Sequence, residues 1–249
     1  MSDKITKAAL VTGGGIRIGK AIALALANSG YDIALHYSRS KEAAFETQAQ
    51  IEAIGQKCKL YCEDFSNIAS GQALIEQVSD DMDGLSVLIN SASVFNEVDF
   101  IDTDVMLLQD TFAINFFAPF MLTQAFAKVV DTKGQSPIAI NILDTRIRKN
   151  QTEHFGYTLT KKCLADFTQM AAKALAPKIR VCAVAPGYIL PPVNQSKPVK
   201  QGNAVDRIAA RIPLAKQGKL SDVTDAVRYL VDHDFVTGEI LFADGGENL

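Results

Sequence analysis

A glycine-rich turn close to the start of the chain constrains the fold more than any other feature. The apolar run 8–11 leads into Thr12-Gly13-Gly14-Gly15-Ile16-Arg17-Ile18-Gly19, after which a helical pattern begins. Glycines allow a tight turn that brings the backbone close to a pyrophosphate, and a helix N-terminus offers amide donors to the same group. A strand before the turn and a helix after it are what a dinucleotide site requires, although such a turn can also exist without a ligand. We predict that Gly13, Arg17, Ile18 and Gly19 contact a dinucleotide.

Short apolar runs and longer amphipathic stretches alternate along the rest of the chain, which is the pattern of βα units. The expected strands are 8–11, 32–36, 57–62, 86–90, 137–142, 179–185 and 240–242. The expected helices are 18–29, 41–54, 69–82, 105–130, 153–176 and 221–231. Because neither a flexible linker nor an internal repeat divides the 249 residues, we predict one α/β domain over 1–249, a Rossmann-type doubly wound parallel seven-stranded sheet.

The irregular stretch 186–202 follows the sixth expected strand, at the edge where such sheets bind ligands, and it predicts a substrate lid within 186–210. A net charge of −3 gives no sign of a basic surface, so we expect no nucleic-acid partner. The start of the chain has no apolar run long enough for a secretory signal, and polar residues and a proline interrupt the longest apolar stretch, 112–130. We expect a cytoplasmic protein with no membrane partner.

The four cysteines are Cys58, Cys62, Cys163 and Cys182. They form no CxxC pair and have no histidine cluster nearby, so neither a zinc site nor a redox pair is indicated. We expect reduced core thiols and no metal site.

The end of the second expected strand indicates which cofactor is bound. A site that prefers NAD places an acidic residue there to bind the ribose hydroxyls, but this strand ends in His36-Tyr37-Ser38-Arg39-Ser40. Arg39 can pair with a 2′-phosphate, Ser40 can donate to it, and Arg17 adds a second positive charge. Arg39 could instead be a solvated surface residue, but the missing acid favours the first interpretation. We predict that the chain binds NADPH.

A tyrosine and a lysine lie one helical turn apart in Tyr157-Thr158-Leu159-Thr160-Lys161. An ammonium near a phenol favours the phenolate and lowers the tyrosine pKa from its usual value of about 10, so that the hydroxyl can act as an acid and a base. This spacing is common by chance. Its position after the fifth strand of a nucleotide-binding sheet is not, and we predict that Tyr157 and Lys161 are catalytic.

These features together resemble those of the short-chain dehydrogenase/reductase family over nearly the whole chain. The matching residues are the turn at 12–19, Asp64, Asn90-Ser91-Ala92-Ser93, Asn115, Tyr157 with Lys161, Pro186-Gly187 and Asp244-Gly245-Gly246. The resemblance implies that Asp64 contacts adenine, that Asn90 lies at the adenosine ribose and that Lys161 holds the nicotinamide ribose. It implies that Asn115 binds a structural water of a proton relay. It adds to the expected cofactor contacts His36, Tyr37, Phe65, Ser91, Ala92, Pro186 and Gly187.

One position departs from the family pattern. Most members carry a serine thirteen residues before the tyrosine, where this chain has Asp144. A carboxylate facing an oxygen that becomes negative would oppose ketone reduction, whereas it suits a substrate that offers N–H donors or takes a proton on nitrogen. Asp144 therefore points to a C=N bond.

Within the family the chain resembles the pteridine reductase branch, which has Asp at that place, and the bacterial dihydromonapterin reductases. The resemblance implies that Phe95 stacks on a flat pterin ring, with Ser93 and Arg17 at the polar edge of that ring. We therefore expect hydride transfer from NADPH to a pterin or dihydropterin, with Tyr157 donating the proton and Asp144 orienting the substrate or passing the proton.

Two other functions stay open. One is a carbonyl reductase such as a 3-oxoacyl-carrier-protein reductase that tolerates Asp144, and the other is a dinucleotide-binding regulator without catalysis. The helices expected at 105–130 and 153–176 carry more apolar residues than one sheet face needs, so we expect a homo-oligomer. The family's habit of assembling through these helices favours a tetramer.

Overall fold

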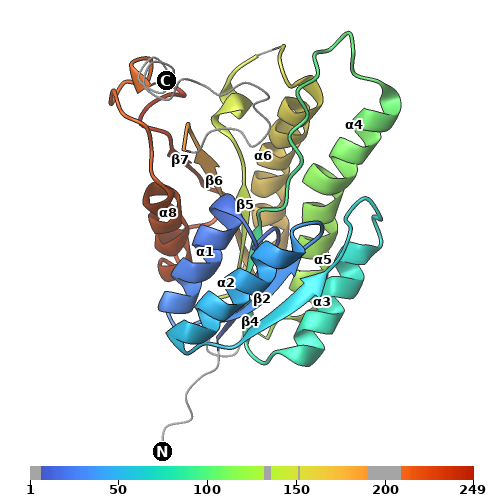
Figure 1. Cartoon of the computed structure of the whole chain (residues 1–249), viewed down its shortest axis with the longest axis vertical. Helices are drawn as coiled ribbons and strands as arrows, with labels where there is room; N and C mark the ends of the chain where they lie inside the picture. Colours follow the sequence, from blue (N-terminus) through green and yellow to red (C-terminus); the bar gives the residue numbers. More distant parts are fainter. Residues whose placement is uncertain (1–6, 132–135, 151, 190–208) are drawn as a thin grey trace, which may run out of the picture.

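The computed structural model describes residues 7–131, 136–150, 152–189 and 209–249. Seven parallel strands form one sheet in the order β3-β2-β1-β4-β5-β6-β7, which confirms the predicted doubly wound fold (Figure 1). The strands are β1 (Ala8–Val11), β2 (Asp32–Tyr37), β3 (Cys58–Cys62), β4 (Leu85–Asn90), β5 (Ile138–Ile142), β6 (Arg180–Pro186) and β7 (Ile240–Ala243). The order of the strands reverses between β1 and β4, where sheets of this type bind their ligands.

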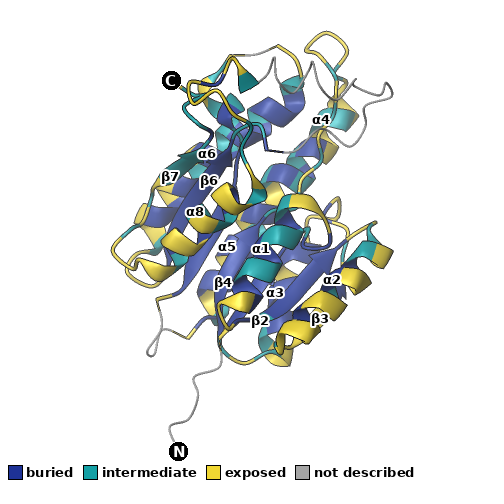
Figure 2. Ribbon diagram, turned by 60° about the vertical axis from the view of Figure 1, so that its left-hand side comes forward, coloured by how far each residue is buried: buried dark blue, intermediate teal, exposed yellow. Residues whose placement is uncertain are grey.

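Helices cover both faces of the sheet, so that the strands form the middle of three layers. One face carries α1 (Arg17–Asn28), α2 (Lys41–Ile54) and α8 (Leu220–Asp232), and the other carries α3 (Ser70–Asp81), α4 (Val105–Phe112), α5 (Ala118–Val129) and α6 (Phe155–Leu175). Neighbouring residues of β1 serve opposite layers, because Ala9 and Val11 pack under α1 whereas Leu10 packs under α3 and α5. Burial on both faces explains the unbroken apolar runs of the sequence, and Figure 2 shows the buried sheet between helices with exposed outer sides.

The helix expected over 105–130 is interrupted. It consists of α4, a π-helical turn η1 (Ala113–Phe117) and α5. Pro119 lies in the first turn of α5 and has no N–H, so Asn115 loses the donor that an α-helix would give its carbonyl group. The wider turn is a common response to such a loss, and π-turns often occur at functional sites.

The helical run Val105–Val129 is long and apolar enough, by length and composition alone, to cross a membrane. A third of its most apolar window is buried inside the molecule, where α5 packs on α3 and η1 on α6. Its exposed apolar side chains include Phe117 and Phe120, and Met170 of α6 is 72% exposed. We expect a second subunit to pack against these exposed side chains, and this expectation stays a prediction.

The prediction that all four cysteines are core thiols is wrong in part. All four are free, and Cys58 and Cys182 are buried. Cys62 is exposed because it ends the edge strand β3, where its side chain leaves the sheet, and Cys163 is half-buried on α6. Within the described residues, no group of three or more His, Cys, Asp or Glu side chains is arranged to hold a metal ion. The lid predicted over 186–210 falls outside the described residues from 190 to 208.

A seam of buried amide and hydroxyl groups joins the middle strands to the helices behind them. Asn90 Nδ2 donates to Asn141 Oδ1 at 2.8 Å and to Thr123 Oγ1 at 3.3 Å, and Asn141 Nδ2 donates to Thr168 Oγ1 at 2.9 Å. All four residues are buried, so the loss of one partner leaves a buried polar group with one hydrogen bond fewer. The seam ties β4 and β5 to α5 and α6.

Replacing Asn141 by Leu tests the seam. The change keeps the branching of the side chain but removes an acceptor from Asn90 and a donor from Thr168, so we expect the free energy of unfolding to fall by about 1–3 kcal/mol. Chemical denaturation measures this quantity. The exposed Asn28→Ala variant is the control and should change it little, and equal stability of the two variants would contradict the seam's role.

Candidate active site

A cavity of about 960 Å³ lies at the carboxyl ends of β1, β2, β4, β5 and β6. It brings together segments that are far apart in the sequence, since its walls come from the glycine turn, the ends of the central strands, the start of α6 and Glu247. The predicted site residues that line it are Gly13, Arg17, Ile18, Gly19, His36, Tyr37, Arg39, Ser40, Asp64, Phe65, Ser91, Ala92, Ser93, Phe95, Asp144, Tyr157, Lys161, Pro186 and Gly187.

Two predicted site residues do not line the cavity. Asn90 ends β4 with its side chain in the buried seam, because its amide is paired with Asn141 rather than turned toward the cavity. Asn115 is fully buried in η1, where Oδ1 accepts from the Val94 amide at 2.9 Å and Nδ2 donates to the Val94 carbonyl at 2.9 Å. The Asn115 side chain therefore holds the segment that carries Ser93 and Phe95.

Close backbone approach explains the glycines of the turn. Gly13 has a φ of 63°, and a Cβ there would lie 3.0 Å from the backbone of Ala92. A Cβ at Gly19 would overlap the carbonyl oxygen of Gly13. Thr12 Oγ1 accepts from the amides of Ser91 and Ala92 at 2.9 and 3.0 Å, which joins the turn to the end of β4. The turn has no room for side chains at these positions, and it is fixed against the next strand.

His36 links the glycine turn to the ends of two strands. Its Nδ1 accepts from the Gly13 amide at 3.2 Å, so Nε2 carries the hydrogen and donates to the Glu63 carbonyl at 3.1 Å. Its ring stacks on Phe65, with ring centroids 4.2 Å apart. Burial lowers the pKa of His36 to about 4, so the side chain is neutral at physiological pH. His36 thus supports the turn without adding charge to it.

Two arginines give this end of the cavity its positive charge. Arg17 and Arg39 are exposed on its wall, and Arg17 has a φ of 52°, a left-handed conformation that is uncommon for a residue with a side chain. Asp64 is also on the wall. A hydrogen bond from the Ser66 amide, and more weakly the charge of Arg39, lower the pKa of Asp64. Asp64 is therefore a carboxylate at neutral pH, on the same wall as the two arginines.

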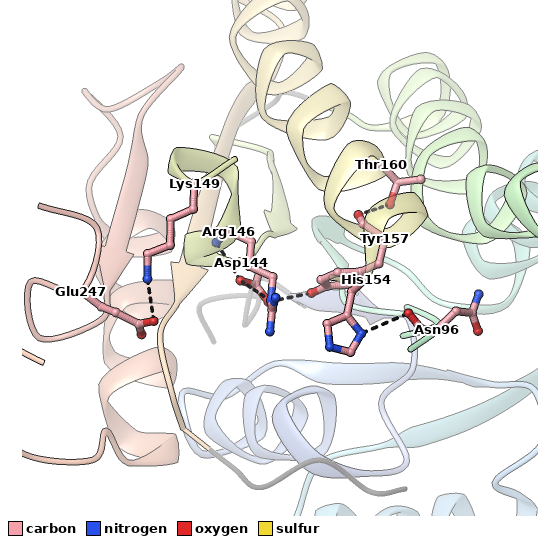
Figure 3. A network of polar contacts seen from close by, with 8 residues as sticks. All are labelled: Asn96, Asp144, Arg146, Lys149, His154, Tyr157, Thr160 and Glu247. Atoms are coloured by element: carbon pink, nitrogen blue, oxygen red, sulfur yellow. Dashed lines mark hydrogen bonds and ion pairs between the residues drawn. The ribbon is translucent and has the colours of Figure 1, made fainter. Parts of the chain in front are cut away.

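The other end of the cavity is built around Asp144 and Tyr157. The Tyr157 hydroxyl donates to Asp144 Oδ2 at 2.9 Å, and Asp144 Oδ1 accepts from the Arg146 amide at 2.8 Å at the start of η2 (Thr145–Arg148) (Figure 3). The Arg146 guanidinium adds an ion pair, with Nε 3.9 Å from Oδ1. Each oxygen of Asp144 thus has a donor, and the carboxylate is fixed facing the phenol.

The pKa of Tyr157 is not lowered in this structure, contrary to what the neighbouring Lys161 led us to expect. Burial and then the negative charge of Asp144 raise the pKa of Tyr157 well above its usual value. The Lys161 ammonium donates to the Ile142 carbonyl at 2.7 Å and lies 5.7 Å from the centroid of the tyrosine ring. Burial lowers the pKa of Lys161 to about 8. Asp144, which is bonded directly to the hydroxyl, outweighs the more distant ammonium.

An aromatic wall stands beside this pair. Phe95 is 38% exposed and lines the cavity, and its ring meets that of Tyr157 edge to face at 4.7 Å. The His154 ring stacks on Phe95 at 4.2 Å, and the Arg146 guanidinium carbon lies 5.6 Å from the Phe95 centroid. Sequence reasoning singled out Phe95 but missed His154 and Arg146, whose closeness in sequence to Tyr157 and Asp144 was the available signal.

An ion pair that the sequence did not indicate closes another side of the cavity. Lys149 Nζ lies 2.8 Å from Glu247 Oε1, and both residues line the wall. The pair joins the end of η2 to the C-terminal segment, on the side of Asp144 away from Asn96 in Figure 3. The two residues are almost a hundred positions apart, and nothing in the sequence indicates that they are in contact.

Known proteins resemble this chain over nearly all of its length. A family model described as enoyl-(acyl carrier protein) reductase matches residues 15–248. FolM alternative dihydrofolate reductase 1 from Brucella canis, solved in complex with NADP, is 33% identical with a TM-score of 0.89, over 98% of this chain and 94% of that one. A blue fluorescent protein from a metagenomic library, solved with NADPH, is 28% identical with a TM-score of 0.88, over 98% of each chain. The 3-oxoacyl-[acyl-carrier-protein] reductase of Synechocystis is 30% identical over 99% of this chain and 98% of its own.

Replacing Asp144 by Asn tests the electrostatic description of the site. The change removes the charge but keeps the shape, so we expect the pKa of Tyr157 to fall, while burial still holds it above its usual value. Phenolate absorbance against pH measures it, with a Tyr157→Phe variant identifying the signal. The Asp64→Asn variant removes a cavity carboxylate elsewhere and should leave this pKa unchanged. Equal pKa shifts in the two Asp variants would contradict the description.

Proposed function

The chain belongs to the short-chain dehydrogenase/reductase family, and we propose that it uses NADPH to reduce a C=N bond in a pterin or dihydropterin. The family assignment makes it an NAD(P)-dependent oxidoreductase. The observation that carries the proposed substrate is the Asp144 carboxylate bonded to the Tyr157 hydroxyl at 2.9 Å. The similarity to the Brucella proteins named FolM alternative dihydrofolate reductase supports the same substrate class.

The charge of Asp144 separates nitrogen chemistry from oxygen chemistry. Reduction of a ketone makes its oxygen negative, and a carboxylate beside that oxygen would raise the barrier. Reduction of a C=N bond adds hydride to carbon and a proton to nitrogen, so the product is neutral at that nitrogen. A carboxylate can accept a hydrogen bond from an N–H of the ring, or, once protonated, pass a proton to a ring nitrogen. Asp144 therefore favours a nitrogen heterocycle.

The proton is proposed to come from the tyrosine and carboxylate pair. The raised pKa of Tyr157 keeps its hydroxyl protonated until a base takes the proton. A ring nitrogen within reach of the hydroxyl or of Asp144 can receive it, because the hydrogen bond between them lets the proton pass from one to the other. Lys161, with a pKa of about 8, lies near enough to stabilise the negative charge that remains after the transfer.

The residues of the other end of the cavity fit NADPH, which supplies the hydride when it is bound. The glycine turn has the backbone approach that a pyrophosphate needs, since Gly13 and Gly19 leave no room for side chains. Arg39 and Arg17 offer two cations for a 2′-phosphate, and the segment 36–40 contains no acid that would repel it. Lys161 is proposed to hold the nicotinamide ribose.

Phe95 is proposed to bind the flat face of the substrate, with Ser93 and Arg17 at its polar edge. Phe95 and Tyr157 both line the cavity and their rings are in contact, so a ring stacked on Phe95 would lie next to the proton donor. Asn115 is proposed to act by fixing this segment through Val94. This role differs from the water relay that the family resemblance implied for Asn115.

A carbonyl reductase that acts on 3-oxoacyl groups is the second candidate, because a relative of that name covers almost the whole chain. Asp144 is the feature that disfavours it. The buried Tyr157 and Lys161 disfavour a non-catalytic regulator, since burying these groups is costly without a use for them. We also propose that the protein works in the cytoplasm as a homo-oligomer, a tetramer being favoured, through the exposed apolar side chains of α5 and α6.

Purified protein should oxidise NADPH when dihydrobiopterin or dihydromonapterin is added, and it should do so more slowly with NADH. The loss of NADPH absorbance measures the rate. Tyr157→Phe should lower kcat by at least about 100-fold because it removes the proton donor, while NADPH affinity stays within a factor of about two. Turnover of an acyl or sugar ketone with none on any pterin would disprove the proposed substrate.

A further inference from the structure

A histidine outside the cavity wall packs on Phe95. His154 is the residue just before α6, three positions ahead of Tyr157, and it has a φ of 55° and a ψ of 46°. A left-handed conformation is unfavourable for a residue with a side chain and persists where the surrounding contacts enforce it. The left-handed conformation of His154 is therefore maintained by the contacts of its side chain.

Two contacts join the His154 side chain to the segment after β4. Its Nδ1 lies 3.1 Å from the carbonyl oxygen of Asn96, and since a carbonyl can only accept, Nδ1 carries the hydrogen and donates (Figure 3). The imidazole also stacks on Phe95, with centroids 4.2 Å apart and ring planes 30° apart. The hydrogen bond fixes the orientation of the imidazole, so the stack fixes Phe95.

The next residues repeat the attachment. The Phe155 amide donates to the Val98 carbonyl at 3.0 Å, and the Phe155 ring meets Phe100 edge to face at 4.9 Å. The start of α6 thus holds the segment 95–100 at several points. Because Tyr157 lies in the first turn of α6, this attachment also sets the distance between Phe95 and the tyrosine ring, 4.7 Å between centroids.

We propose that His154 is a positioning residue for the substrate: it holds the Phe95 ring at the angle and distance from Tyr157 that a flat heterocycle needs for stacking beside the proton donor. The inference rests on the proposed function, since it supposes that such a ring stacks on Phe95. His154 itself is not part of the cavity wall, so it acts through Phe95 rather than by touching the substrate.

The role predicts a specific kinetic pattern in the His154→Asn variant. Asn tolerates the left-handed conformation, so the backbone can stay as it is while the imidazole is lost. We expect the KM for dihydrobiopterin to rise about two- to tenfold, which is the range that the loss of one aromatic pair corresponds to. We expect kcat to change less than KM, because Tyr157 and Asp144 keep their own hydrogen bond, and NADPH affinity to stay constant.

The chain offers a matched control. His233 also flanks a helix, at the end of α8, stacks on an aromatic ring (Tyr229, 4.2 Å) and has its Nδ1 2.8 Å from a backbone carbonyl. It is exposed and does not line the cavity. The His233→Asn variant loses the same kinds of contact, so we expect its KM to equal that of the wild type. Equal KM changes in the two variants would overturn the positioning role.

A double-mutant cycle with Phe95→Leu separates positioning from general structural damage. If His154 acts through Phe95, adding His154→Asn to Phe95→Leu should raise the KM no further, whereas independent damage would add to it. Additive effects of the two substitutions on the KM overturn the inference. It is also overturned if Phe95→Leu raises the KM while His154→Asn keeps the KM of the wild type. If Phe95→Leu also leaves the KM unchanged, the inference fails together with the proposed stacking of the substrate. Failure of the proposed function as a whole is recognised separately, by the absence of pterin turnover in the wild type.

Discussion

The hydrogen bond between the Tyr157 hydroxyl and Asp144 is the interaction around which the substrate end of the cavity is arranged. It joins the end of β5 to the first turn of α6, and it requires the carboxylate to be held rather than solvated. The Arg146 amide and guanidinium hold its other oxygen, and Phe95 shields the same phenol ring. A carboxylate at this place changes the charge that the site presents to a substrate, and the proposed choice of nitrogen over oxygen follows from that charge.

The cofactor end depends on a different kind of constraint, the exclusion of side chains from the glycine turn. Gly13 and Gly19 lie where any Cβ would meet backbone, and Thr12 fastens the turn to the end of β4. The segment 36–40, where a family member that prefers NAD has an acid, carries none, and burial keeps His36 neutral. The two ends share the strand edge but use opposite electrostatics, cations toward the proposed phosphate and a carboxylate toward the proposed substrate.

Most of the fold was predictable because both faces of the sheet are buried, which gives unbroken apolar strands and amphipathic helices with clear ends. The π-turn at η1 was not, since it depends on how Pro119 and Asn115 fit a neighbouring segment. Motif residues such as Gly19 and Tyr157 are local in sequence and were found. The orientation of Asn90 and the exposure of Cys62 depend on tertiary neighbours, and so does the balance of charge at Tyr157, where direct contact with Asp144 outweighs the more distant Lys161.

The most direct test of the account exchanges the one residue on which the substrate proposal depends. The kcat/KM ratio between dihydrobiopterin and an aliphatic ketone is measured in the wild type and in Asp144→Ser, which restores the usual hydroxyl. If the carboxylate selects nitrogen over oxygen, the ratio falls by at least about tenfold in the variant, because pterin reduction weakens while the penalty on a developing oxyanion is removed. An unchanged ratio, with the wild type and Asp144→Ser equally active on pterin, would contradict a selective role for the carboxylate.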